Sequence, residues 1–290
     1  MNVPDNREMQ GLLAKLEAKS SYQRKRVNKY QETLGADDET FSLHRLTSHD
    51  DLLLKQTCEF LSGVFEQGMD DEDKIMNQWI FDFDIAYHAL TDKEGKVIAA
   101  ANSSYMPLEN SESILAVWYV AVAEEYRGKR LANELYQSIY QFAEDRAQDY
   151  HTKVKAIVGE ASHQEIQTIE QVLRREEISR KRAYYYDQSG IIKEVPYVSP
   201  PLKWDSETGA PAEEAQPNHL MLKLINGQES MPAKELLQII TAIYRDSYSP
   251  REEDFMNKEY HDRAVAVVDG HLRTIETALA EASNGKVFLK

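Results

Sequence analysis

Cysteine is almost absent from this chain, since Cys58 is the only one among its 290 residues. A single thiol cannot form an intrachain disulfide, and it cannot supply the paired cysteine ligands of a structural zinc site. Histidines occur, but none in the H-E-x-x-H arrangement of a catalytic zinc helix. The sequence therefore predicts a protein that binds no metal and works in a reducing compartment, for which we expect the cytoplasm.

Long apolar runs and positive charge are also scarce. Nowhere do eighteen apolar residues follow one another, and residues 1–10 lack the apolar core of a signal peptide. The 34 lysines and arginines are outnumbered by 49 acidic residues, which gives a formal net charge of −15. Such a charge repels nucleic acid and mildly favours cationic ligands. We expect no membrane span, no nucleic-acid partner and a substrate that carries positive charge.

Hydrophobic periodicity predicts alternating helical and extended segments. Helices are expected at 6–34, from 48 to about 65, at 129–146, at 164–185, after 230, and at 257–283. Strands are expected at 80–90, 97–103, 114–122, 154–158, 191–195 and 219–224. The turn between the first two strands ends in Gly95, which can take a positive φ. The unbroken apolar run at 114–122 indicates a central strand covered on both faces.

The order of these segments predicts an α/β (α+β) fold, in which helices flank a mixed central β-sheet. Three regions are expected: an N-terminal helix in residues 1–38, a main domain in 39–226, and a C-terminal α-helical extension in 227–290. The polar loop between the last two strands is long enough to border a binding site.

One turn concentrates positive charge in this acidic chain. Residues 127–132 follow the central strand and open the next helix, and three of the first four are Arg127, Lys129 and Arg130. A helix N-terminus offers free backbone N–H groups and the positive end of the helix dipole. Together with the cationic side chains, these groups make phosphate the natural ligand. The turn therefore predicts a site for a diphosphate.

This segment resembles motif A of the GNAT acetyltransferases, whose pattern Gln/Arg-x-x-Gly-x-Gly/Ala holds the pyrophosphate of coenzyme A. The aligned residues are Arg127, Gly128, Lys129, Arg130, Leu131 and Ala132. Ala132 fits the pattern, whereas Arg130 stands where the first motif glycine usually lies, so its side chain is expected to point outward. The resemblance covers residues 40–224 and implies a GNAT fold that uses acetyl-CoA as cosubstrate.

The resemblance implies roles for residues outside the turn as well. Val120 and Val122 would contact the pantetheine arm through their main chain, and a backbone N–H of this strand would meet the developing oxyanion, because the family splays this strand from the next. Tyr186, four residues before Gly190, matches a tyrosine that protonates or hydrogen-bonds the coenzyme A sulfur. The alternative for Tyr186 is a packed aromatic side chain.

Acetyl transfer to an amine also needs a base, because a lysine-like ammonium has a pKa of about 10.4. Glu160, just beyond the strand at 154–158, is the candidate, because the family opens its substrate site beside this strand end. His163 and Glu112 are reserves. The alternative for Glu160 is a structural carboxylate that caps a helix or joins an ion pair.

We therefore expect an N-acetyltransferase that moves an acetyl group from acetyl-CoA to a primary amine. Two alternatives stay open. The chain could be a catalytically silent module that binds coenzyme A, or an acyltransferase supplied by acyl carrier protein, with the basic stretch 24–29 as docking face. The C-terminal helices would cap the acceptor site or form a homodimer contact. Nucleotide-binding glycine loops and a G-x-S-x-G elbow are absent, which argues against those classes.

Overall fold

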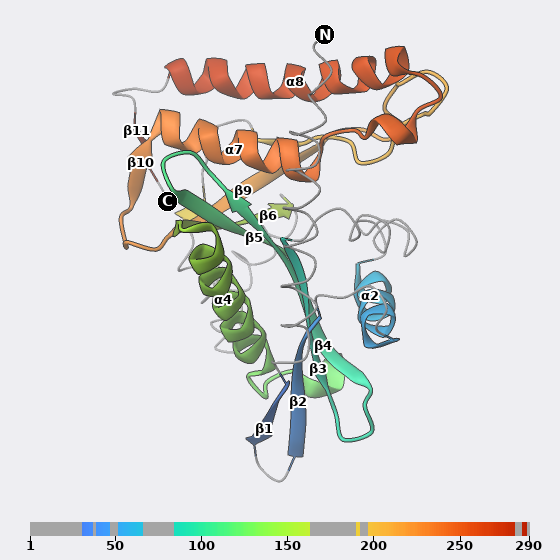
Figure 1. The fold of residues 1–290 in the computed structure, drawn as a ribbon, viewed down its shortest axis with the longest axis vertical. Helices are drawn as coiled ribbons and strands as arrows, with labels where there is room; N and C mark the ends of the chain where they lie inside the picture. Colours follow the sequence, from blue (N-terminus) through green and yellow to red (C-terminus); the bar gives the residue numbers. More distant parts are fainter. Residues whose placement is uncertain are drawn as a thin grey trace, which may run out of the picture. The chain divides into compact units, whose positions relative to one another are not determined.

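A computed structural model of the chain describes residues 31–36, 39–46, 52–65, 84–162, 190–191, 197–281 and 286–288. The chain divides into two compact units, the first comprising residues 1–103 and 119–142, and the second residues 104–118 and 143–290. Strands β4 (Val97–Pro107) and β5 (Glu112–Val122) each contribute residues to both units. Figure 1 labels the elements.

The first unit is a β-sheet with strand order β1-β2-β3-β4-β5. Strands β1 (Gln31–Ala36), β2 (Glu39–Leu46) and β3 (Ile85–Thr91) pair in antiparallel fashion. Helix α2 (Leu52–Val64) buries one face against this sheet. The shared core consists of Leu46, Leu54, Cys58, Leu61, Tyr87, Ala89, Val97, Ala100 and Ala121.

The helix expected up to residue 34 is wrong at its C-terminal end, because Gln31–Ala36 forms strand β1. Strand β2, with which it pairs, was not expected either. In β2 the buried residues Phe41 and Leu43 alternate with the half-buried Ser42, which is the period of a strand. Helix propensity is a weak preference that cross-strand pairing overrides. Residues 1–30 of the expected helix lie outside the described residues.

The predicted hairpin between β3 and β4 is confirmed. Gly95 takes a φ of 80°. The Asp92 carboxylate closes the turn by accepting the backbone N–H groups of Glu94 at 3.0 Å and Lys96 at 2.9 Å. Strand β4 runs to Pro107, four residues beyond the expected end.

Helix α4 (Leu131–Tyr150) follows the central strand, as predicted. Leu131, Leu135, Ile139 and Phe142 recur at spacings of four and three, and all are buried. The helix begins two residues later than expected, because residues 127–130 form a turn. The strand after it, β6 (Lys153–Ser162), lies parallel to β5, as a strand-helix-strand unit requires.

The second unit contains strands in the order β4-β5-β6-β9-β7. Strand β9 (Gln216–Leu224) is antiparallel to β6 and also pairs with β7 (Gly190–Ile191) and β8 (Val198–Ser199). The sheet is therefore mixed, with β5 and β6 parallel and other pairs antiparallel, and helices flank it. This confirms the predicted fold class.

Helices α7 (Ala233–Ser247) and α8 (Lys258–Glu281) form the expected helical part of the C-terminal segment (Figure 1). They share one hydrophobic core with the strands of the second unit, to which β6 contributes Ala156 and Val158 and α7 contributes Leu236, Ile239, Ile240 and Ile243. The elements β10, α7, α8 and β11 of the C-terminal segment therefore pack into the same core as β6 and β9. Among the helices described, none combines the length and the apolar character needed to cross a bilayer.

The expected helix start at Ser230 and Pro232 is wrong, since Ser230–Pro232 forms the short strand β10, which pairs with β11 (Lys286–Phe288). Pro232 has a ψ of 138°, which is extended, and the helix starts immediately after it. Proline lacks a backbone N–H, so it suits this position just before the helix.

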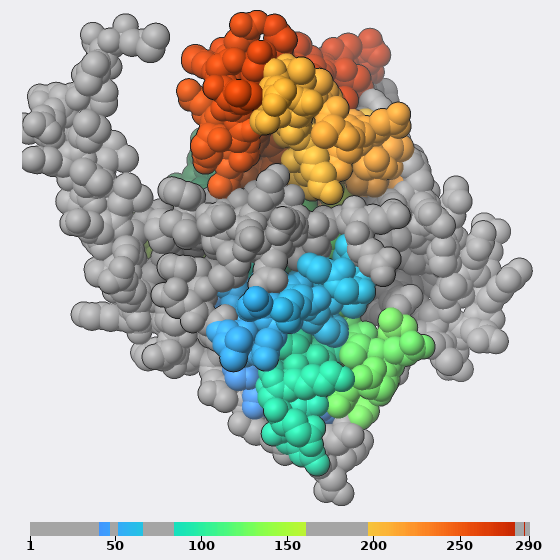
Figure 2. Space-filling model, turned by 90° about the vertical axis from the view of Figure 1, so that its right-hand side faces the viewer, coloured from blue at the N-terminus to red at the C-terminus, as the bar shows by residue number. Residues whose placement is uncertain are grey.

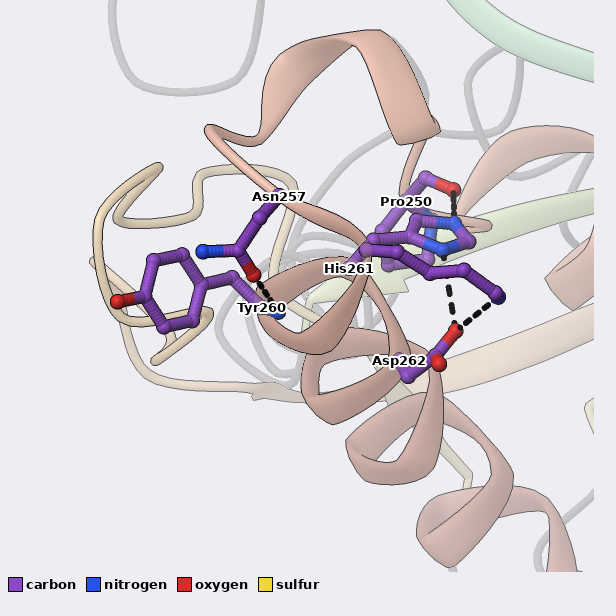
Figure 3. A network of polar contacts seen from close by, with 6 residues as sticks. Pro250, Asn257, Tyr260, His261 and Asp262 are labelled. Atoms are coloured by element: carbon purple, nitrogen blue, oxygen red, sulfur yellow. Dashed lines mark hydrogen bonds and ion pairs between the residues drawn. The ribbon is translucent and has the colours of Figure 1, made fainter.

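The N-terminus of α8 is fixed by side chains and by the loop after β8. Asn257 caps the helix, because its Oδ1 accepts the N–H of Tyr260 at 3.1 Å, and His261 lies with Nε2 3.1 Å from the carbonyl oxygen of Pro250 (Figure 3). The N–H of Met256 donates to the carbonyl oxygen of Ser206 at 3.0 Å. In Figure 2 this loop, coloured yellow-orange, lies against the orange residues of the C-terminal segment.

Candidate functional site

The cationic turn lies where the sequence places it, between β5 and α4. The 3-10 turn η1 (Glu124–Tyr126) follows β5 directly. Its end is closed by two backbone hydrogen bonds, from Tyr126 N–H to the Ala123 carbonyl at 2.9 Å and from Arg127 N–H to the Glu124 carbonyl at 3.2 Å. Residues 127–130 then turn the chain into α4, whose buried Leu131 anchors the start of the helix.

Two residues of this turn have a left-handed backbone, Gly128 with φ 87° and Arg130 with φ 63°. Arg130 thus adopts at the motif position the conformation that favours glycine. For a residue with a side chain this costs roughly 1 kcal/mol. The Arg130 side chain is exposed, as expected. The substitution of glycine by arginine therefore preserves the path of the turn and adds a charge to it.

The turn presents hydrogen-bond donors and positive charge together. Within the described residues, the backbone N–H groups of Gly128 and Arg130 have no hydrogen-bond acceptor. Arg127 and Arg130 are exposed and form no ion pair with a described carboxylate, although Arg127 Nε lies 3.4 Å from the Val122 carbonyl oxygen. Lys129 Nζ lies 5.0 Å from the centre of the Tyr126 ring. This combination suits a phosphate group.

Strand β5 separates from β6 part of the way along its length. The two strands pair from Glu112 opposite Lys153 to Ala116 opposite Val158, and no later pair joins them among the described residues. Strand β5 continues to Val122, whereas β6 stays paired with β9 up to Ser162. Val120 and Val122 both lie on the part of β5 beyond the paired stretch.

A side chain from β4 takes one backbone donor of this part of β5. The N–H of Tyr119 donates to Oδ1 of Asn102 at 3.2 Å, and Asn102 is buried. The ring of Tyr119 packs against Phe65, with the ring centres 5.0 Å apart. The neighbouring Val120 and Val122 are half-buried. The sequence carries no motif that would have identified Asn102.

Glu160 lies near the end of β6, and three hydroxyl groups donate to its carboxylate. Tyr197 donates to Oε1, while Ser199 and Tyr248 each donate to Oε2 at 2.6 Å. Ser199 in turn accepts a hydrogen bond from Nδ2 of Asn218 at 2.7 Å. We call Glu160, Tyr197, Ser199, Asn218 and Tyr248 the carboxylate cluster.

Burial decides the protonation of Tyr197, one of the donors to this carboxylate. Burial raises the pKa of Tyr197 well above its ordinary value, and the negative charge of Glu160 raises it further. Its hydroxyl therefore stays protonated and acts as a donor. A carboxylate has about four acceptor positions, and three are taken here. The cluster thus holds the Glu160 carboxylate in one orientation and leaves about one acceptor position without a donor among the described residues.

The reserve bases are placed differently. Glu112 is the first residue of β5 and forms an ion pair with Lys155 Nζ at 2.8 Å, and the same nitrogen lies 2.6 Å from a carboxylate oxygen of Glu235. Although burial acts in the opposite direction, these two carboxylates raise the pKa of Lys155. Glu112 is therefore engaged in a charge cluster of its own. His163, Tyr186 and the basic stretch 24–29 lie outside the described residues.

The sequence pointed to Glu160 but to none of its partners. Tyr197 and Ser199 belong to the short segment around β8, and Tyr248 follows α7, about ninety positions from Glu160 along the chain. No local spacing connects them. The long polar loop between the predicted strands was the only signal, because such loops often border a site.

Comparison with known proteins gives a family match for part of the chain. The sequence model of the Acetyltransferase (GNAT) family matches residues 51–173. A search of curated protein sequences gave no match. The matched segment contains the cationic turn, β5, α4 and Glu160.

Solved structures with a similar backbone include several acetyltransferases. The aminoglycoside acetyltransferase meta-AAC0020 from an uncultured soil metagenomic sample is 13% identical with a TM-score of 0.36, over 47% of this chain and 88% of that one. NAA60 of Arabidopsis thaliana, solved with a bisubstrate analogue, is 10% identical with a TM-score of 0.39, over 59% and 94%. Glucosamine-6-phosphate N-acetyltransferase of Arabidopsis thaliana is 17% identical with a TM-score of 0.33, over 48% and 94%.

Proposed function

We propose that the chain transfers an acetyl group from acetyl-CoA to a primary amine, because residues 51–173 match the sequence model of the GNAT family of acetyltransferases. One observation supports the proposal most. The turn before α4 combines the left-handed backbone of Gly128 and Arg130 with exposed cationic side chains. In an acidic chain such a turn is suited to a diphosphate.

The residues of the turn fit coenzyme A. The backbone N–H groups of Gly128 and Arg130 have no acceptor among the described residues, and the first N–H groups of any helix lack a partner within the helix. Arg127, Lys129 and Arg130 would neutralise the diphosphate, while Leu131 and Ala132 hold the first turn of α4 close to it. Val120 and Val122 would hydrogen-bond the pantetheine arm through their backbone.

In the proposed reaction the amine nitrogen forms a bond to the acetyl carbon of acetyl-CoA, the thioester C–S bond breaks, and coenzyme A leaves as a thiol. The amine must first lose a proton, since fewer than about one lysine-like amine in a thousand is neutral at pH 7. We assign this proton to Glu160, whose carboxylate is already oriented by three donors. Tyr186 would donate a hydrogen bond or a proton to the departing sulfur, as the family resemblance implies.

Calorimetric titration with acetyl-CoA tests the binding step. We expect Arg127→Ala to raise Kd roughly 3- to 10-fold, because a charge-assisted hydrogen bond to phosphate is lost. Arg273→Ala, which removes the same charge from an exposed position on α8, should leave Kd unchanged. A protein that takes up no coenzyme A species would refute the proposal.

Release of free thiol tests the transfer step. Incubation of the protein and acetyl-CoA with a panel of primary amines, including polyamines and amino sugars, should release thiol with at least one of them. Glu160→Gln should lower kcat/KM by about 100-fold or more, because a general base contributes about that much. The variant should also lose the decrease of kcat/KM at acid pH. Tyr186→Phe should lower kcat while acetyl-CoA binding persists. Binding without release for every amine would instead support a non-catalytic coenzyme A module.

A further inference from the structure

The residue that follows helix α7 contacts the carboxylate of Glu160. Tyr248, the residue that caps its C-terminus, donates its hydroxyl to Oε2 of Glu160 at 2.6 Å, and the Tyr248 side chain is buried. Tyr248 lies far beyond residue 173, where the family match ends. The C-terminal segment therefore supplies one of the three donors to a carboxylate that lies within residues 51–173, the part of the chain that matches the family model.

Contacts along its length hold α7 in this position. At its first turn, Glu235 pairs with Lys155 of β6 at 2.6 Å. Farther along, the ring of Tyr244 packs edge-on against Tyr197 and Tyr248, with ring centres 5.9 Å apart in each pair. The hydroxyl of Tyr248 thus reaches Glu160 from a rigid support.

We propose that Tyr248 is a positioning residue, which orients the carboxylate of Glu160 toward the amine acceptor; this inference rests on the proposed function. Oε2 has two donors, Ser199 and Tyr248. They approach from different elements, β8 and the end of α7, and so restrict rotation of the carboxylate. Without Tyr248, this oxygen retains Ser199 alone.

The expected consequence concerns turnover rather than binding of acetyl-CoA. A catalytic group displaced by about 1 Å can slow a reaction about 100-fold. Because Tyr248 acts through Glu160, which is not among the residues proposed to bind acetyl-CoA, the affinity for acetyl-CoA should be unaffected. The role predicts a loss in kcat without a loss in acetyl-CoA binding.

The test compares Tyr248→Phe with Tyr244→Phe. Each variant removes one hydroxyl and keeps the ring, and the two positions are four residues apart at the end of α7, but the hydroxyl of Tyr244 donates to the Val198 carbonyl rather than to Glu160. We expect Tyr248→Phe to lower kcat about 10- to 100-fold with Kd for acetyl-CoA unchanged. Tyr244→Phe should stay within about twofold of the wild type. Equal effects of the two variants would overturn the inference.

A double-mutant comparison separates positioning from general packing. In the Glu160→Gln background, Tyr248→Phe should cause no further loss of kcat, because there is no longer a base to orient. The same loss in both backgrounds would show that Tyr248 acts independently of Glu160, and the inference would fail.

Failure of the inference can be told apart from failure of the proposed function. If wild-type turnover is lost in Glu160→Gln but unchanged in Tyr248→Phe, the role of Tyr248 is refuted and the acetyltransferase remains. If the wild type binds no acetyl-CoA, or if no amine of the panel leads to release of thiol, the proposed function and the role of Tyr248 are both refuted.

Discussion

Nδ1 of His88 lies 2.8 Å from Oγ of Ser138, and this hydrogen bond joins strand β3 to helix α4 inside the first unit. Nε2 of the same ring lies 3.1 Å from Oγ of Ser103 on β4. Burial lowers the pKa of His88 well below its ordinary value, and the nearby positive charge of Arg45 lowers it further. The imidazole is therefore neutral in the folded chain.

This neutral histidine makes stability depend on pH. On unfolding, the pKa of His88 returns to about 6.5, so below that pH the unfolded chain binds a proton that the folded chain does not. The free energy of unfolding should fall as pH drops from 6.5 toward the lower folded pKa, by up to about 1.4 kcal/mol per pH unit. Urea denaturation at pH 5, 6 and 7 measures this slope. His88→Gln should flatten it, whereas His271→Gln on α8 serves as control. Equal slopes for His88→Gln and the wild type would contradict the explanation.

The left-handed backbone at Arg130 predicts opposite effects on stability and on binding. Arg130→Gly removes the strain of a side chain at a φ of 63°, whereas Arg130→Ala keeps it. The glycine variant should be more stable than the alanine variant by roughly 1 kcal/mol in chemical denaturation. Both lose the same charge, so both should bind acetyl-CoA roughly 3- to 10-fold more weakly than the wild type. A greater stability of Arg130→Ala would show that this backbone conformation is not strained.

Gly209 lies in the loop between β8 and β9, next to the backbone of Tyr260 in α8. It has a φ of 69°, and a Cβ atom placed on it would lie 2.1 Å from the carbonyl oxygen of Tyr260. We expect Gly209→Ala to lower the free energy of unfolding by roughly 3 kcal/mol, from this clash and the left-handed backbone together. Gly227 has a φ of 71° with open space around it, so Gly227→Ala should cost only about 1 kcal/mol. Similar losses for the two variants would exclude the clash with Tyr260.

The cap of α8 can be tested without touching the core. Asn257 accepts the N–H of Tyr260 through its side chain (Figure 3). Asn257→Ala removes this acceptor and should lower the free energy of unfolding by about 1 kcal/mol, whereas Asn257→Ser should stay within a few tenths of the wild type. Thermal denaturation of the three proteins measures the difference. If serine costs as much as alanine, capping is not what Asn257 contributes.

The parts of the fold that the sequence predicted are those with strong local periodicity. Helix α4 carries four buried residues at helical spacing, and β5 is a continuous apolar run, so both were found. Strands β1 and β10 were missed because short strands are defined by their partners. The partner of β10 is β11, more than fifty residues later in the chain.

The same distinction between local and long-range features holds for the candidate site. The cationic turn was predictable, because its donors, charges and helix start lie within six consecutive residues. The partners of Glu160 were not, because Tyr197, Ser199 and Tyr248 come together only when β8 and α7 pack beside β6. Sequence alone left a catalytic and a structural role open for Glu160, and its hydrogen bonds now define variants that separate the two.

The left-handed conformation of Arg130 has a consequence for how such turns diversify. Because Arg130 adopts a backbone conformation that favours glycine, the residue type at this position can change while the backbone conformation of the turn is retained. The strength of anion capture could then be adjusted by single substitutions, without rebuilding the bend or the helix that follows. Sequence searches that require glycine at this position would miss chains in which another residue adopts the same backbone conformation.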